Sequence, residues 1–277
     1  MNHKPVYKRF IDTLQRGFAA LDDDAQRQTA AFLKNQLHPD GGFRDRAGNP
    51  DPYYSVFGML ISKALHETEL LYLLKLWAFN DRQITMAGQV DEISLQLIRT
   101  LLKPEYRGAS WLYHLRTMVS GKGSVDAAYH LFLLLLLMDV QNKNRSFPRL
   151  ILKIALRLKR PTQDLPCSAT AAWLFARKEL GLEFRSQTGR LMKYYREGSG
   201  FVSYRDSGKA DLLSSAVAAF VLAESGADLN TVRKDCLELL EQNYDRGAFL
   251  SGEGDAGGDT EYTFYGLLLL GSLMKNE

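Results

Sequence analysis

The sequence predicts an all-α protein, an (α/α)6 toroid in which six helical hairpins form one domain over residues 1–277. Three observations lead to this fold class. A loop with Gly and Phe, followed by a helix that starts at an Asp, recurs along the chain. Apolar segments begin at or just after an Asp at intervals of about 35 to 48 residues, the size of a helical hairpin with its loops. These segments alternate with charged amphipathic ones, and because no period-two pattern is found, strands are not expected.

The repeat is clearest over Gln36–Ser55 and Gln242–Thr263. In both copies a Gln precedes a Phe by seven residues, a Gly lies two before the Phe, and an Asp-x-x-x-Ser/Thr sequence follows. A partial copy runs from Gly200 to Ser215, with Tyr194 in place of the Gln. Each Asp is a good N-cap, because its carboxylate accepts from free N–H groups of the first helical turn. The helix starts expected on this basis follow Asp51, Asp91, Asp126, Asp164, Asp211 and Asp259.

The elements follow in order along the chain, beginning with residues 1–20 as an extra N-terminal helix. Helices apolar nearly all round are expected to be buried, and they cover Val56–Leu65, Leu131–Met138, Ala169–Ala176, Ala216–Ala223 and Leu267–Met274. Their amphipathic outer partners are expected over Asp24–Leu37, Glu67–Phe79, Tyr106–Val119, Arg149–Lys159, Phe184–Arg196 and Leu229–Gln242. Closing the inner helices into a ring buries their apolar faces and brings every Asp-led start to the same end. An open solenoid of helix pairs has the same period and stays an alternative.

Composition excludes several classes of protein. A net charge of +3 without a dense Lys/Arg stripe argues against nucleic acid as a partner. Two distant cysteines suggest neither a disulfide framework nor a zinc knuckle, which favours the cytoplasm. The N-terminus lacks the apolar core of a signal peptide, and the longest apolar run, Leu131–Met138, is too short for a transmembrane segment.

The Gly-Gly-Phe loop before Asp51-Pro-Tyr-Tyr-Ser resembles the prenyltransferase and squalene-cyclase repeat of protein prenyltransferase β subunits and terpenoid cyclases. The resemblance is strong over residues 36–65 and 242–274 and moderate over 200–225. It implies a toroid whose central cavity takes a hydrophobic substrate, such as a prenyl diphosphate or terpenoid, in a bacterial-type enzyme or binding protein. Fold resemblance alone does not establish an activity.

The metal and acid signatures of that family are missing. The helix starts after Asp51, Asp211 and Asp259 carry neither the Cys nor the His that would hold zinc, so no zinc and no other cofactor are expected. Cys167 follows Asp164 one place later than the ligand position. The acidic run that a cyclase needs has its nearest match in Asp22–Asp24, which is more simply a helix N-cap.

Residues in the first turns of the inner helices are expected at the cavity or its rim. The substrate-binding candidates are Tyr53, Tyr54, Tyr129, Cys167 and Tyr262, together with Arg205 and Lys209 on the loop before Asp211. Aromatic faces stabilise a developing cation, and the two cations suit an anionic head group, as do Arg44 and Arg46. For each candidate a purely structural role, in packing or as a solvated loop cation, is the simpler interpretation.

Two pairs of titratable residues are the catalytic candidates. His130 lies one turn after Asp126 and has the chemistry of an acid or base near neutral pH. Glu261 lies beside Asp259, and neighbouring carboxylates raise one another's pKa and produce a proton donor. Local capping and helix-dipole stabilisation explain the same residues without chemistry. The acidic loop 252–259 is a candidate lid or divalent-metal site, although its spacing does not match a calcium loop.

Two rival functions remain open. A non-catalytic toroid would bind a protein partner or a second copy of itself, which the missing zinc ligands and cyclase acid favour. A carbohydrate-active (α/α)6 enzyme would pair Asp259 or Glu261 with Asp51 or Asp126. The chain has only three tryptophans, Trp77, Trp111 and Trp173, so platforms for stacking sugars are scarce.

Overall fold

The computed structural model describes residues 4–80, 84, 86, 88–120, 127–141, 150, 152–154, 165–252, 254–255 and 257–275, and it leaves out the side chains of 115, 117–120 and 127–129. This part of the chain is mostly helical, as predicted. Its helices are α1 (Val6–Ala19), α2 (Asp23–Gln36), α3 (Pro52–Ala64), α4 (Thr68–Ala78), α5 (Gln89–Leu102), α6 (Trp111–Ser120), α7 (Ala127–Gln141), α9 (Cys167–Glu179), α10 (Gly189–Met192), α11 (Leu212–Ser225), α12 (Asn230–Gln242) and α13 (Thr260–Leu273). None of these described helices combines the length and apolarity needed to cross a membrane.

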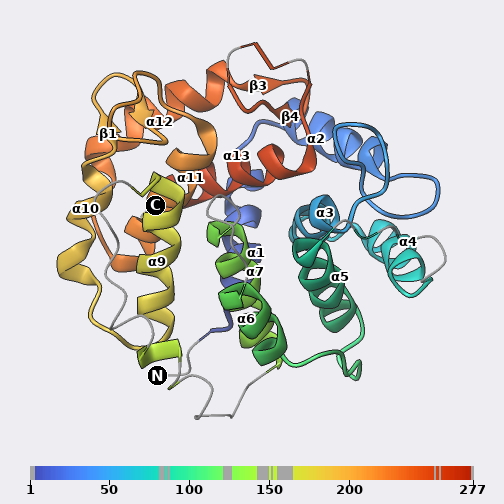
Figure 1. Cartoon of the computed structure of the whole chain (residues 1–277). Coiled ribbons are helices and arrows are strands. Elements are labelled where there is room, and N and C mark those ends of the chain that lie inside the picture. The colour runs from blue at the N-terminus through green and yellow to red at the C-terminus, as the bar shows by residue number, and fades with distance from the viewer. Residues whose placement is uncertain are drawn as a thin grey trace.

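The apolar helices contact one another in a cyclic order. Contacts join α3 to α5, α5 to α7, α7 to α9, α9 to α11 and α11 to α13, and α13 returns to α3 (Figure 1). The amphipathic helices α4, α6 and α12 each contact the two apolar helices that flank them in the chain. Apolar side chains drive this arrangement, since most residues of α3, α11 and α13 are buried.

The repeated loops carry the same hydrogen bond in each copy. The buried backbone N–H of Phe43 donates to the Ser55 hydroxyl at 2.8 Å, and Phe201 donates to Ser215 at 3.0 Å. In the C-terminal copy, Phe249 donates to the Thr263 hydroxyl at 3.3 Å. The Ser/Thr of the repeat therefore has a structural role, because it satisfies a backbone donor that no water reaches.

The glycine two residues before the Phe is required by both conformation and packing. Gly41 and Gly247 have φ angles of 108° and 91°, in the left-handed region. A Cβ on Gly41 would lie 2.7 Å from the carbonyl oxygen of Leu73 in α4, and one on Gly247 would lie 2.3 Å from that of Gln28 in α2. Each loop thus rests directly on the backbone of an outer helix.

The Asp-led helix starts are partly confirmed. Asp51, Asp211 and Asp259 accept from the backbone N–H groups of Tyr54, Ser214 and Tyr262, and Asp22 caps α2 through Ala25. The assignment of Asp91 was wrong, because α5 begins earlier and Gly88 occupies its N-cap. Asp126 and Asp164 lie outside the described residues.

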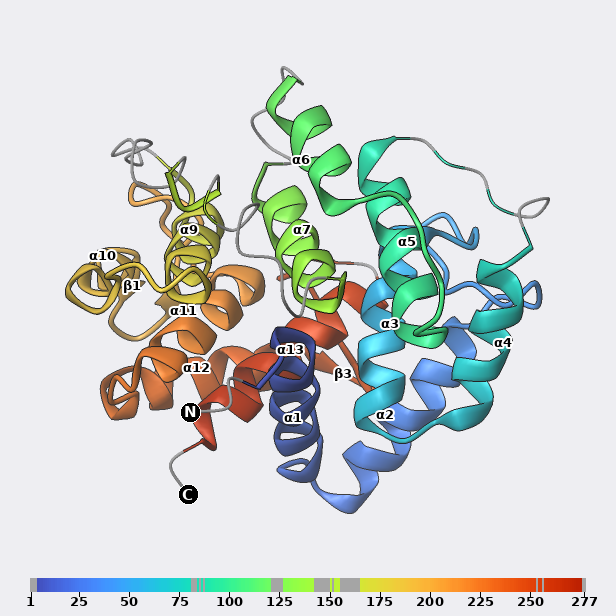
Figure 2. The same cartoon turned by 90° about the horizontal axis from the view of Figure 1, so that it is seen from below.

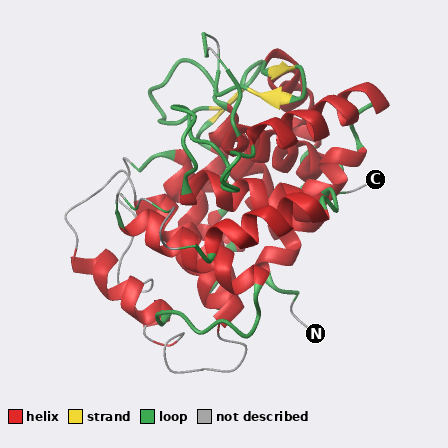
Figure 3. Cartoon of the chain, turned by 90° about the vertical axis from the view of Figure 1, so that its right-hand side faces the viewer, coloured by secondary structure: helices red, strands yellow, loops and turns green. Residues whose placement is uncertain are grey.

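Two further expectations need correction. Short antiparallel ladders do occur, pairing β1 (Tyr195–Arg196) with β2 (Gly200–Phe201) and β3 (Tyr244–Asp245) with β4 (Ala248–Phe249). They fold back within the repeat loops, and two residues are too few to give a period-two signal. These strands and the loops that carry them lie at one end of the molecule (Figure 3).

The outer helix expected over Phe184–Arg196 is not regular. A 3-10 turn over Arg185–Gln187 precedes the single-turn helix α10, and β1 follows. Ser186 donates from its N–H and hydroxyl to the Glu183 carboxylate, and Thr188 donates to the Arg185 carbonyl. Such local side-chain bonds compete with helix formation, and Gly189 weakens the helix further.

The predicted N-terminal helix, α1, packs against α13, α3 and α7 (Figure 2). Two glycines form its closest approach. A Cβ on Gly17 would lie 2.1 Å from the Leu267 carbonyl oxygen, and one on Gly271 would lie 1.8 Å from that of Thr13. The backbones of α1 and α13 are therefore in direct contact.

Ser55→Ala is expected to lower the free energy of unfolding by about 1–3 kcal/mol, because it leaves the buried Phe43 N–H without an acceptor. Urea unfolding measures the change. Ser225→Ala is the matched control, since that hydroxyl bonds only to the Leu222 carbonyl of its own helix. Equal effects of the two substitutions would contradict the structural role of the repeat hydroxyl.

Candidate functional site

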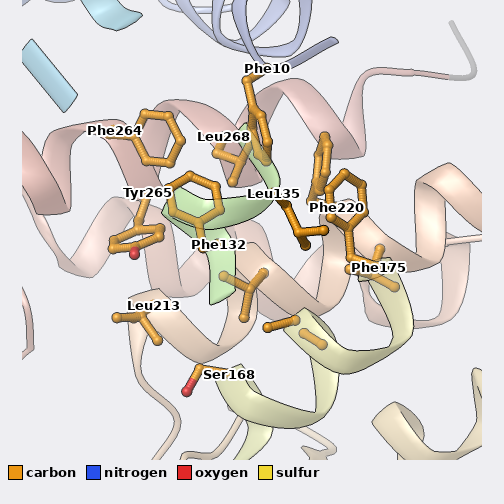
Figure 4. A pocket seen from close by; sticks show the side chains of 14 residues that line it. Phe10, Phe132, Leu135, Ser168, Phe175, Leu213, Phe220, Phe264, Tyr265 and Leu268 are labelled. Atoms are coloured by element: carbon orange, nitrogen blue, oxygen red, sulfur yellow. The ribbon is translucent and has the colours of Figure 1, made fainter. Parts of the chain in front are cut away.

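An apolar pocket lies where α1, α7, α9, α11 and α13 meet (Figure 4). It has a volume of about 60 Å³. Its walls are Phe10, Phe132, Leu135, Ser168, Ala171, Ala172, Phe175, Leu213, Val217, Phe220, Val221, Phe264, Tyr265 and Leu268. Among these described residues only Ser168 and Tyr265 carry polar side-chain atoms, so the pocket suits an uncharged hydrocarbon group.

Helical spacing explains which side chains face the pocket. On α13 the lining residues are Phe264, Tyr265 and Leu268; Leu268 lies four residues after Phe264 and three after Tyr265, the spacing of one helix face. Glu261 lies one turn before Tyr265 on the same face. The first turn of α13 therefore places a carboxyl group one helical turn from two residues that line the pocket.

Five residues form what we call the mouth cluster: Arg46, Tyr53, Asp259, Glu261 and Tyr262. The Tyr53 hydroxyl donates to Glu261 Oε1 at 2.7 Å. Arg46 Nε donates to Asp259 Oδ2 at 2.7 Å, and its guanidinium lies 5.5 Å from the centre of the Tyr262 ring. The cluster thus joins the loop before α3, the start of α3 and the start of α13, which are distant in sequence.

Burial controls the charge of Glu261, whose residue is only 8% exposed. Desolvation raises the pKa of its carboxyl group from 4.5 to about 7; the charges of Asp259 and Asp51 act in the same direction, while Tyr53 and Arg46 oppose it. Burial also raises the pKa of Asp259, against the hydrogen bonds from Tyr262 and Arg46. Glu261 therefore holds a proton on a substantial fraction of molecules near neutral pH, which suits a general acid.

An aromatic layer connects Glu261 to the pocket. The Tyr53 ring meets Phe57 edge-on, with ring centres 4.9 Å apart. Phe57 in turn lies 5.1 Å from Phe264 and 5.9 Å from Tyr265, both of which line the pocket. Packed aromatic rings therefore lie between Glu261 and the pocket.

Arg46 has a different environment from the one expected of an anion-binding cation. Its guanidinium bonds to Asp255 at 2.9 and 3.1 Å as well as to Asp259. Burial raises the pKa of the Asp255 carboxyl group, but the hydrogen bonds from Ser251 and Arg46 outweigh burial and lower the pKa to about 2. Asp255 and Asp259 of the acidic loop are therefore fastened to the first repeat loop. No group of three or more His, Cys, Asp or Glu within the described residues is arranged to hold a metal ion.

The other predicted residues lie away from the pocket. Cys167 is fully buried, with its thiol directed to the Ser214 carbonyl at 3.7 Å, and the neighbouring Ser168 lines the pocket instead. Burial raises the pKa of the Cys167 thiol well above its usual range, so it stays protonated. His130 is half-buried on another face of α7 from Phe132. Its proposed partner Asp126 and the side chain of Tyr129 lie outside the described residues.

The predicted cations and Tyr54 are found at the surface loops and the rim. Arg205 packs 5.4 Å from the centre of the Tyr194 ring, and Lys209 is exposed on the same loop. Tyr54 meets Tyr53 edge-on at 5.8 Å, and burial raises its pKa to about 12. The structure brings the predicted residues Tyr53, Asp259, Glu261 and Tyr262 together, whereas no role was predicted for the pocket walls.

The missed residues are chiefly aromatic: Phe10, Phe132, Phe175, Phe220 and Phe264. The predicted candidates all belong to first helical turns or the loops before them, whereas Phe175 and Phe220 lie seven residues beyond the first-turn residues Ser168 and Leu213. Aromatic residues one to two turns into these helices were the available signal. Comparison of the chain with protein-family models, curated proteins and solved structures found no match in any of the three.

Proposed function

We propose that the chain is an α/α toroid of six helical hairpins, similar to the terpenoid cyclases and prenyltransferase β subunits, which binds a hydrophobic isoprenoid without zinc. The cyclic contacts of the apolar helices and the three equivalent repeat loops support the architecture. One observation carries the function: a buried, protonatable Glu261 lies one helical turn before Phe264 and Tyr265, which line an aromatic, apolar pocket.

The mouth cluster favours an uncharged substrate over a prenyl diphosphate. Arg46 is neutralised by Asp255 and Asp259, so it has no charge to spare for an anionic head group. Glu261 adds a further acidic group. An alkene or prenyl alcohol avoids the repulsion that a diphosphate would meet beside these carboxyl groups.

Glu261 is the proposed proton donor. Its O–H proton adds to a substrate C=C bond, whose π electrons form the new C–H bond and leave a carbocation beside a carboxylate. The ring faces of Phe264 and Tyr265 stabilise that cation. Loss of a proton from a neighbouring carbon to the Glu261 carboxylate forms a new C=C bond and restores the acid, so the overall reaction is an isomerisation or cyclisation.

The size of the pocket restricts the substrate. At about 60 Å³ it is far below the roughly 300–1,000 Å³ of pockets that enclose a whole ligand. The pocket therefore receives only the end of a hydrocarbon chain, and the remainder extends toward the mouth cluster. A short isoprenoid fits this arrangement better than a long one.

Deuterium incorporation tests the proposal directly. The protein is incubated in D2O with geraniol, farnesol and the corresponding diphosphates, and recovered products are analysed by mass spectrometry. We expect carbon-bound deuterium in the alcohols, unchanged by EDTA, because the proton donor is Glu261. Glu261→Gln should abolish it, whereas the control Glu238→Gln, at an exposed site on α12, should not.

The absence of both deuterium and bound isoprenoid would reject this function and favour a protein-interaction subunit. That second candidate has an observation of its own, since Tyr72, Leu76 and Phe79 form an exposed apolar stripe on and just after α4. A carbohydrate-active enzyme gains no support, because Trp77, Trp111 and Trp173 are all buried and provide no sugar platform.

A further inference from the structure

Helix α1 contributes to the pocket although it is not part of the repeat. It lies against the C-terminal half of α13, where Gly17 meets Leu267 and Gly271. From this position it directs Phe10 into the pocket (Figure 4). The pocket thus has walls from the repeated helices and one side chain from an added helix.

The Phe10 ring closes the deep end of the pocket, the end farther from the first turns of α9 and α11, and its centre lies 6.0 Å from that of Phe264. It stacks on Phe220, with centres 4.5 Å apart and planes at 19°, and meets Phe132 edge-on at 5.4 Å. Phe175 lies 6.0 Å away. Both Phe175 and Phe220 are two turns beyond the first-turn residues of α9 and α11, so this closed end lies about 10 Å deeper than the helix starts.

A buried ion-pair network holds Phe10 in place. Its neighbour Arg9 forms ion pairs with Glu179, at 2.5 Å, and with Glu224. These two glutamates lie at the C-terminal ends of α9 and α11, and Lys178 also pairs with Glu224. Arg9 is 12% exposed at its side chain, and its guanidinium lies 5.4 Å from the centre of the pocket residue Phe175. The ion pairs of Arg9 therefore fix how deeply α1 inserts the Phe10 ring.

We propose that Phe10 is the specificity-determining residue of the pocket, a floor that restricts its ligands to short hydrocarbon ends. This inference rests on the proposed function for its substrate class, but the floor itself is a property of the packing. Removing the ring would join its volume to the existing cavity and admit a longer chain. Arg9 is a positioning residue that acts through Phe10.

Two probe series separate the floor from the function. The first series consists of n-alkanols from butanol to decanol, which test only pocket length. The second consists of dimethylallyl alcohol, geraniol and farnesol, which test isoprenoid binding. Titration calorimetry of the full chain compares the wild type with Phe10→Leu and Phe10→Ala. Phe43→Leu is the matched control, because Phe43 is fully buried but does not line the pocket.

We expect the wild type to bind short alkanols best and both Phe10 variants to prefer longer ones, with a gain of about tenfold in affinity for the longer chains. Phe43→Leu should leave the preference unchanged. If Phe10→Ala does not fold, Phe10→Leu decides the question.

An alkanol preference that is the same in the wild type and the Phe10 variants, or no alkanol binding by any of them, would overturn the floor. Should the alkanol preference shift while no prenyl alcohol binds, the floor stands and the isoprenoid function is rejected. Should the prenyl alcohols bind without any alkanol shift, the function stands and the floor is rejected.

Discussion

Glu261→Gln is expected to stabilise the protein by about 3 kcal/mol at pH 8. In the folded state the pKa of Glu261 rises from 4.5 to about 7, since burial disfavours its charge. The folded state therefore binds this proton more tightly than the unfolded state does. The free energy of unfolding of the wild type is therefore highest below about pH 4.5 and falls as the pH rises toward 7. Each unit by which the folded pKa exceeds the unfolded value corresponds to about 1.4 kcal/mol. Gln keeps an acceptor for Tyr53 and removes the titration.

Urea unfolding of the two proteins at pH 4.5, 6, 7 and 8 measures this effect. The difference in free energy of unfolding should be small at pH 4.5, grow between pH 4.5 and 7, and stay constant above that. Glu238→Gln, exposed on α12, should show no such growth. A variant that is no more stable than the wild type at pH 8 would contradict the burial of Glu261. A carboxyl group that lowers the stability of the folded protein because it is buried is typical of a functional residue.

Gly271→Ala is expected to destabilise the protein by about 3 kcal/mol, because it forces α1 off α13. A Cβ at this position would lie 1.8 Å from the Thr13 carbonyl oxygen and 2.8 Å from the Gly17 nitrogen, so both contacts are with backbone. Neither a rotamer change nor a side-chain shift relieves such an overlap. The helix α1 must move as a unit, and with it Phe10 leaves the pocket.

Two measurements follow the displaced helix. Urea unfolding gives the loss of stability, and binding of a hydrophobic fluorescent dye should increase as the pocket opens. Gly189→Ala is the control, since a Cβ there meets nothing within 4 Å and alanine favours helix α10. A change below about 0.5 kcal/mol in Gly271→Ala would show that α1 tolerates displacement and does not seal the pocket.

Much of the architecture follows from local sequence chemistry. Asp51, Asp211 and Asp259 cap helices because a carboxylate suits the free N–H groups of a helix start, whatever the remainder of the chain does. Gly41 and Gly247 mark turns because their φ angles favour glycine. Where these local signals were absent or mixed, prediction was wrong, as at Asp91 and over Phe184–Arg196.

The candidate site was half predictable for the same reason. The repeat located Tyr53, Asp259, Glu261 and Tyr262 at equivalent helix starts. It gave no indication that Arg46 pairs with Asp255 and Asp259, because these partners lie 209 and 213 residues further along the chain. The ion pair depends on α13 lying beside α3, which is a long-range contact.

Residues close together along the chain were enough to predict the helical class, the repeat and the helix starts at Asp51, Asp211 and Asp259. The depth and chemistry of the pocket, in contrast, depend on how the helices pack against one another. The Phe10 ring stacks on Phe220 because α1 packs against α13. The pKa of the Glu261 carboxyl group is raised because its folded neighbours exclude water. Burial and long-range contacts are properties of the assembled fold, and no local pattern encodes them.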